Sequence, residues 1–179
     1  MGTRFQFPRF FLARVNRRSP PHRRCQLDNE RIREICLALP HAVETLNWGN
    51  ILVYWAGDRD LGGKMFAMTN ADGMGELVLS FPVGSERFHE LLENEGVYAE
   101  PHLARAHWVA LDRWEALPAR QIEDELRRAH TLIFEKLPKR TKAVLALPKK
   151  EQARILRERR KELAAQGKTR KNGAFGRSA

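Results

Sequence analysis

An apolar stripe at helical spacing opens the part of the chain that has a regular hydrophobic pattern. Its positions repeat at i, i+3, i+4 and i+7, the spacing that gathers side chains on one face of a helix. Asp28 or Asn29 comes just before it, and side chains of these types accept backbone N–H groups at helix N-caps. Pro40 follows it and ends the pattern. We therefore predict a helix whose buried face consists of Ile32, Ile35, Cys36 and Leu39.

Between residues 43 and 81 the apolar residues instead form short runs typical of β-strands, each bounded by turn residues. The loops between the runs are short enough for hairpins, and Gly49-Asn50 is a favourable turn dipeptide. Close spacing of this kind predicts an antiparallel meander. The four predicted strands are 43–48, 51–56, 64–69 and 77–81.

After the fourth run the helical period returns. Ser85 can cap a helix whose inner face includes Phe88, and a strand is predicted at 106–111. A long amphipathic helix follows the break at Pro118, with Ile122, Leu126, Ala129 and Ile133 on its inner face. The elements together predict an α+β fold: an antiparallel sheet of about five strands with helices packed on one face.

The two ends of the chain differ from this body. Residues 150–166 have the pattern of a helix, but its apolar stripe is too thin for a core element. The composition of residues 167–179 is typical of disorder. We therefore divide the chain into a basic disordered leader at 1–27, one domain at 28–140, and a basic, partly helical tail at 141–179.

Charge is distributed unevenly along the sequence, although the whole chain carries a formal charge of +10. Residues 1–27 hold seven arginines and no acid, and residues 136–179 hold fifteen Lys or Arg against three Glu. The remainder has ten basic and nineteen acidic residues, so the central body is acidic. The basic ends suggest a nucleic-acid partner, whereas the body would repel one. Whether residues 1–27 are a native segment, a targeting segment or the product of a misassigned start codon stays open.

Other classes of protein find little support in the sequence. Cys25 and Cys36 have neither metal-ligand nor disulfide spacing, which favours a reducing compartment, and we expect a cytoplasmic protein. No apolar run approaches the roughly 18 residues that a membrane span needs. The sequence lacks a nucleophile elbow and a phosphate-binding glycine loop. We expect no enzymatic activity, no cofactor and no metal.

Residues 97–111 gather the side chains most suggestive of a site: two histidines, an arginine and a tryptophan beside an apolar strand. Each histidine is more simply explained as a hydrogen-bonded structural residue than as a catalyst. Trp108 has cationic neighbours in Arg105 and His107, as a base-stacking tryptophan requires. Packing in the core is the alternative for Trp108.

Three local motifs resemble the MmcQ/YjbR family. They are Leu37-Ala38-Leu39-Pro40-His41-Ala42-Val43-Glu44, Gly63-Lys64-Met65-Phe66-Ala67, and Pro101-His102-Leu103-Ala104-Arg105-Ala106-His107-Trp108-Val109, with Phe134-Glu135-Lys136-Leu137-Pro138-Lys139 closing the last helix. The resemblance covers about 28–140. It implies a small non-enzymatic protein with a fold similar to CyaY and frataxin, and nucleic-acid binding is proposed for the family. The similarity to frataxin makes iron worth checking, although the acidic ridge of those proteins is not evident here.

The resemblance and the basic tail together lead to the hypothesis of DNA binding through phosphate contacts. The rival hypothesis is a protein-interaction or small-ligand module of the same fold with no nucleic-acid role, and a metal-handling module is a minor third. The residues expected to contact DNA are Lys64, His102, Arg105, His107, Trp108, Lys139, Arg140, Lys142, Lys149, Lys150, Arg154 and Arg157. The sequence specifies no target sequence and no oligomeric state.

Overall fold

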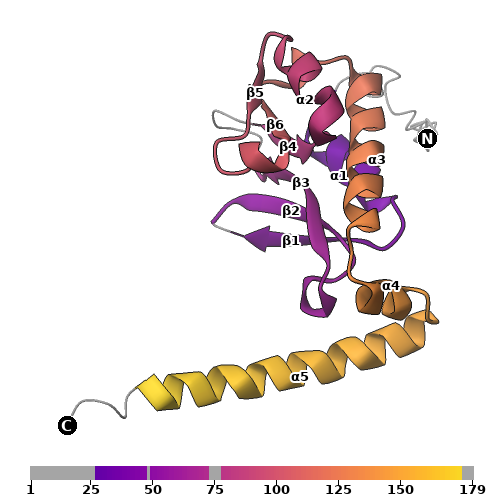
Figure 1. The fold of residues 1–179 in the computed structure, drawn as a ribbon, viewed down its shortest axis with the longest axis vertical. Helices are drawn as coiled ribbons and strands as arrows, with labels where there is room; N and C mark the ends of the chain where they lie inside the picture. Colours follow the sequence, from indigo (N-terminus) through magenta and orange to yellow (C-terminus); the bar gives the residue numbers. More distant parts are fainter. Residues whose placement is uncertain (1–26, 48, 73–77, 175–179) are drawn as a thin grey trace, which may run out of the picture.

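A single antiparallel sheet organises the computed structural model, which describes residues 27–47, 49–72 and 78–174. Its six strands lie in the order β1-β2-β3-β4-β6-β5 (Figure 1). The strands are β1 (Ala42–Asn47), β2 (Ile51–Ala56), β3 (Lys64–Asn70), β4 (Leu79–Pro82), β5 (Val97–Ala99) and β6 (Trp108–Leu111). The predicted α+β class is therefore confirmed.

Strand β5 is one element that the sequence pattern did not predict. Val97–Ala99 pairs with β6 at the edge of the sheet, with Val97 opposite Leu111 and Ala99 opposite Val109. Three residues are too few to establish an alternation of apolar and polar positions. The predicted count of about five becomes six because this short segment pairs through its backbone.

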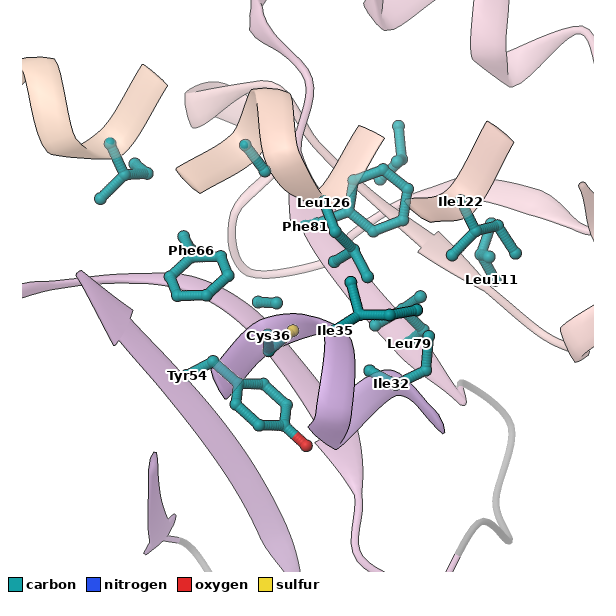
Figure 2. Close-up of a cluster of buried hydrophobic side chains, with 14 of the residues drawn as sticks. Ile32, Ile35, Cys36, Tyr54, Phe66, Leu79, Phe81, Leu111, Ile122 and Leu126 are labelled. Carbon is teal, nitrogen blue, oxygen red and sulfur yellow. The ribbon is translucent and has the colours of Figure 1, made fainter. Parts of the chain in front are cut away.

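Helices α1 (Asn29–Leu37), α2 (Gly84–Leu92) and α3 (Ala119–Glu135) pack against one face of the sheet (Figure 1). The core lies between these helices and the strands. Figure 2 shows Ile32 and Cys36 of α1 and Leu126 of α3 converging on Phe66 and Leu79 of the sheet. Burial raises the pKa of the Cys36 thiol, so this cysteine is an inert packing residue.

The predicted helix starts have mixed outcomes. Asp28 is the N-cap of α1, and its carboxylate accepts the backbone N–H of Arg31 at 2.8 Å, as expected. Ser85 is not a cap: the N-cap of α2 is Val83, two residues earlier, and no side-chain hydrogen bond forms there. Gly84 explains the early start because it adopts a φ of +76°, which a glycine adopts without strain.

The three C-terminal helices each begin directly after a Leu-Pro dipeptide. Pro118 precedes α3, Pro138 precedes α4 (Lys139–Leu145), and Pro148 precedes α5 (Lys149–Ala174). A proline ends the preceding helix, and because it has no N–H it removes one of the donors that lack a partner at the start of the next helix. The predicted domain boundary after residue 140 falls inside α4, which is held to the body by the buried Thr141 and Leu145.

The other face of the sheet carries a different set of side chains. Successive strand residues point to opposite faces, so positions between the core residues face away from the helices. By their register, Ile51, Met68 and Ser80 lie on this outer face. The segment between β5 and β6, residues 100–107, carries the third family motif and covers part of it.

Candidate functional site

The segment 100–107 is fixed by its own hydrogen bonds. Glu100 donates its backbone N–H to the carbonyl of Trp108 at 3.0 Å, and its own carbonyl accepts from Leu103 at 3.1 Å. The Glu100 carboxylate also accepts the backbone N–H of His102 at 2.9 Å. A turn of 3-10 helix at Ala104–Ala106 then leads into β6. Most of the motif thus forms a defined turn rather than an open loop.

His107 ends that turn in a left-handed conformation with a φ of +56°. Its carbonyl accepts the N–H of Val83 at 2.9 Å, and its ring lies edge-on to Phe88 at 5.4 Å between centroids. These contacts join the segment to the start and the inner face of α2. They give His107 a structural role, independent of any contact with DNA.

Trp108 does not fit the predicted role in stacking on a nucleic-acid base. It opens β6 opposite Pro82, and only 4% of its surface is exposed. A base cannot reach the face of a ring that is buried to this degree. The alternative of core packing is the correct one, and we remove Trp108 from the candidate nucleic-acid contacts.

His102 and Arg105 are the exposed polar side chains of this segment. Among the described residues, the Arg105 guanidinium has no carboxylate partner. A free guanidinium offers a planar set of donors that suits a phosphate. The structure therefore leaves Arg105 available for the predicted contact, together with the exposed His102 of the same segment.

A cavity of about 560 Å³ lies between the outer face of the sheet and the segment 100–107. Its walls are chiefly apolar, with Ile51, Met65, Met68 and Leu103 among them. Glu100 and Ser80 also line it, and each is only 5% exposed. Sequence reasoning missed this feature. The available signal was an acid, Glu100, placed between a short apolar strand and a proline.

Lys64 and Lys142, two predicted DNA contacts, are engaged with the end of α3. The Lys64 amine donates to the carbonyl of Lys136 at 2.9 Å, and that of Lys142 donates to the carbonyl of Glu135 at 2.8 Å. Lysines at a helix C-terminus satisfy unpaired carbonyls and oppose the negative end of the helix dipole. Lys142 also lies 5.9 Å from the centroid of the Phe134 ring. Both amines thus stabilise the fold.

The remaining predicted cations lie on α4 and α5, away from the segment 100–107. All of them are exposed, and among them Arg154 pairs with Glu151 at 3.1 Å. The side chains of the others make no hydrogen bond or ion pair with any described residue; they are Lys139, Arg140, Lys149, Lys150 and Arg157. The predicted set therefore divides into an exposed C-terminal group and a smaller group beside the sheet.

Four exposed cations form a row along α5, which we call the basic stripe. It consists of Lys150, Arg154, Arg157 and Lys161, spaced at i, i+4, i+7 and i+11. Residues three and four apart share one face of a helix. Lys161 was not in the predicted set, although its helical spacing from Arg157 is visible in the sequence.

Residues of α5 outside the basic stripe attach the helix to the body. The Arg160 guanidinium pairs with Asp58 at 3.0 Å and with Asp60 at 2.9 Å, in the turn between β2 and β3. The Gln152 side chain donates to the carbonyls of Leu145 and Leu147, which end α4. These contacts hold the first half of α5 and leave the basic stripe exposed. Figure 1 shows α5 as a single long helix that extends away from the layer formed by α1, α2 and α3.

A glycine and a histidine of the family motifs lie at tightly packed positions of the fold. A Cβ on Gly63 would lie 2.1 Å from the carbonyl oxygen of Gly57, so the second motif needs a glycine there. His41 of the first motif adopts a φ of +57° and stacks on Phe134, which stacks in turn on His130. His130 is 6% exposed and donates to the carbonyl of Pro40 at 2.9 Å.

Comparison with known proteins agrees with the motifs. The model of the YjbR family matches residues 37–132, more than half of the chain. The chain belongs to the YjbR family. The matched region runs from the end of α1 to near the end of α3, and it includes the whole sheet and the segment 100–107. A search of curated proteins finds no match.

A solved structure with the same architecture comes from Deinococcus radiodurans. The crystal structure of its protein DR2400, described as a DUF419 domain, is 29% identical to this chain and superposes with a TM-score of 0.58. The alignment covers 66% of this chain and 88% of DR2400. The YjbR-family chain therefore spans nearly all of that protein.

Membrane-spanning helices and clusters of metal-binding side chains were also sought among the described residues. In the part of the chain that the structure describes, no helix is both long and apolar enough to cross a membrane. Within the same residues, no three His, Cys, Asp or Glu side chains come together in a way that could hold a metal ion.

Proposed function

We propose that this YjbR-family chain binds double-stranded DNA through the basic stripe of α5, and that its role is binding rather than catalysis. The observation that carries the proposal is the exposure of all four cations of the stripe. Cations that neutralise phosphates release condensed counterions, which favours binding to any sequence. Contacts of this kind position a protein on a duplex without reading bases.

The dimensions of the stripe support this role. From Lys150 to Lys161 the helix rises about 16 Å, because each residue adds about 1.5 Å. Successive phosphates of one strand lie about 3.4 Å apart along the duplex axis, so the stripe can face several of them. The acidic body repels DNA, and a basic helix that extends away from it is the surface best placed to make the contact.

The exposed cations outside the stripe extend the same surface. Lys139, Arg140 and Lys149 lie on α4 and at the start of α5, next to the stripe in the chain. Arg105 and His102 lie beside the sheet and add a contact only where a duplex reaches that far. We therefore expect Arg105 to contribute less to affinity than any residue of the stripe.

The test is duplex binding by the full chain, measured by fluorescence anisotropy across a series of salt concentrations. The stripe variant carries Lys150→Gln, Arg154→Gln, Arg157→Gln and Lys161→Gln together. The matched control carries Arg9→Gln, Arg14→Gln, Arg17→Gln and Arg18→Gln, which changes the net charge by the same amount in residues 1–27.

The expected result is weaker binding by the stripe variant and a slope of log K against log salt that is shallower by roughly 3 units. The control should keep most of the affinity and the slope. Equal losses in the two variants would mean that net charge alone drives binding. Absence of binding by the full chain at low salt would contradict the proposal.

A further inference from the structure

The cavity between the sheet and the segment 100–107 has the construction of a ligand site. Small-molecule sites are typically concave and mostly apolar, with volumes of roughly 300–1,000 Å³ and a few polar groups that fix orientation. This cavity, about 560 Å³, has apolar walls from Ile51, Met65, Met68 and Leu103. The two methionine side chains are flexible and polarizable, so they adapt to ligands of different shape.

Glu100 is the unusual member of this lining. A carboxylate has two oxygens with about four acceptor positions. Among the described residues, its one polar partner is the backbone N–H of His102. The other carboxylate oxygen is not fully buried, so a further donor or a positive charge can reach it. The cavity is the side from which such a group can come.

Ser80 repeats this pattern on the sheet side. Its residue surface is 5% exposed, and its hydroxyl has no hydrogen-bond partner among the described residues. The hydroxyl oxygen is not fully buried, so an occupant of the cavity can reach it and supply a partner. Two poorly partnered polar groups in one apolar cavity indicate an occupant with a polar end and an apolar body.

We propose that the cavity binds a small hydrophobic amine, whose ammonium group pairs with the Glu100 carboxylate and whose apolar body packs against Met65 and Met68. The charge of Glu100 selects a cation over a neutral or anionic molecule of the same shape. The apolar walls exclude a strongly hydrated cation such as a free metal ion. The site is separate from the basic stripe, so either proposal can fail without the other.

The test uses the full chain and three probes with the same body: phenylbutylamine, phenylbutanol and phenylbutyrate. The readout is the NMR signal of ¹³C-labelled methionine methyl groups. The chain has four methionines, of which Met65 and Met68 line the cavity.

The expected result is a saturable shift of the Met65 and Met68 signals, with the amine binding at least tenfold tighter than the alcohol. Glu100→Gln keeps an oxygen for the N–H of His102 but removes the charge, so the amine should lose this preference. Glu93→Gln, at an exposed position after α2, is the matched control and should behave as the unaltered chain does.

Three outcomes would overturn the inference. Absence of any shift at Met65 and Met68 with all three probes would mean that the cavity takes no such ligand. Equal affinity for the amine and the alcohol in the unaltered chain would remove the role of the carboxylate, even if Glu100→Gln fails to fold. Tighter binding of phenylbutyrate would assign the cavity to anions.

Discussion

Two histidines of the family motifs, His41 and His107, adopt left-handed backbone conformations. Few residues other than glycine adopt a positive φ, and histidine, asparagine and aspartate are the enriched exceptions. Both rings also stack on or pack edge-on to a phenylalanine. At the residue scale, backbone geometry and packing therefore explain both His41 and His107.

This explanation predicts an inverted order of stability at residue 107. His107→Ala keeps the strained φ and loses the ring contact, whereas His107→Gly loses the ring but relieves the strain. We expect the glycine variant to have a free energy of unfolding higher by about 1 kcal/mol than the alanine variant. Urea denaturation measures this. The ordinary order, with alanine the more stable, would show that the conformation carries no strain.

His130 predicts a dependence of stability on pH. Burial lowers its pKa below the ordinary value of 6.5, against the opposing effect of its hydrogen bond to Pro40. Below pH 6.5 the unfolded chain binds a proton that the folded protein does not, so stability falls as the pH falls toward the lowered pKa. His130→Gln should lose less stability than the unaltered chain between pH 7 and pH 5.5 in urea denaturation. His89→Gln, at an exposed position, should lose as much as the unaltered chain.

A buried ion pair joins α2 to α3. The Glu125 carboxylate is 1% exposed and accepts from Arg87 at 2.7 Å and from the more exposed Arg128 at 3.1 Å. Arg87→Met should lower the free energy of unfolding by about 3 kcal/mol because it leaves a buried carboxylate poorly compensated. Arg128→Met, which removes a largely exposed partner, should cost less than about 1 kcal/mol. Similar losses in the two variants, measured by urea denaturation, would contradict this assignment.

At the scale of elements, the helices were predictable because their apolar periods are long. The stripe of Ile32, Ile35 and Cys36 places α1 against the sheet, and α3 follows from the same rule. The strand Val97–Ala99 could not be predicted, since pairing with β6 depends on backbone contact rather than on pattern. The start of α2 was missed because the freedom of Gly84 replaced a side-chain cap.

The candidate site was less predictable than the fold. The exposed cations of α4 and α5 follow directly from composition, so most of the predicted contacts are available. Trp108 and the cavity depend on how the segment 100–107 folds over the sheet, which no local pattern reports. The one signal in the sequence, an acid between a short apolar strand and a proline, does not by itself separate a buried Glu100 from a solvated one.

The ion pairs that attach α5 to the body give a prediction about hydrogen exchange in this helix. Arg160 makes the ion pairs with Asp58 and Asp60 that hold this helix against the β2–β3 turn. Arg160→Ala should increase hydrogen exchange at the amides of α5 that follow residue 155, because the helix loses its anchor. Exposed ion pairs contribute little to global stability, so the unfolding midpoint should barely change. Arg157→Ala, on the basic stripe, should leave exchange unaltered, and equal effects of the two substitutions would contradict the anchor.

At the scale of the whole molecule, opposite charges occupy separate regions. Residues 28–135 have nineteen acids against ten bases, whereas residues 136–179 have fifteen bases against three acids. Under the proposed function, this separation combines a sheet domain that would repel a duplex and a helix that would attract it in one chain. The cavity lies in the acidic body and the basic stripe lies outside it. The two proposed sites therefore differ in both location and charge.

This separation predicts that the body folds without α5. A chain ending at Pro148 keeps the sheet, the three core helices and α4, whose Thr141 donates to the carbonyl of Leu61 at 2.8 Å. We expect cooperative thermal unfolding within a few degrees of the full chain, since α5 adds none of the buried core residues. Binding to duplex DNA at low salt should be lost. A chain ending at residue 140 cuts α4, so it should be less stable than the one ending at Pro148. If the chain ending at Pro148 does not fold, α5 is part of the domain; if it folds and still binds DNA, the contact lies in the body.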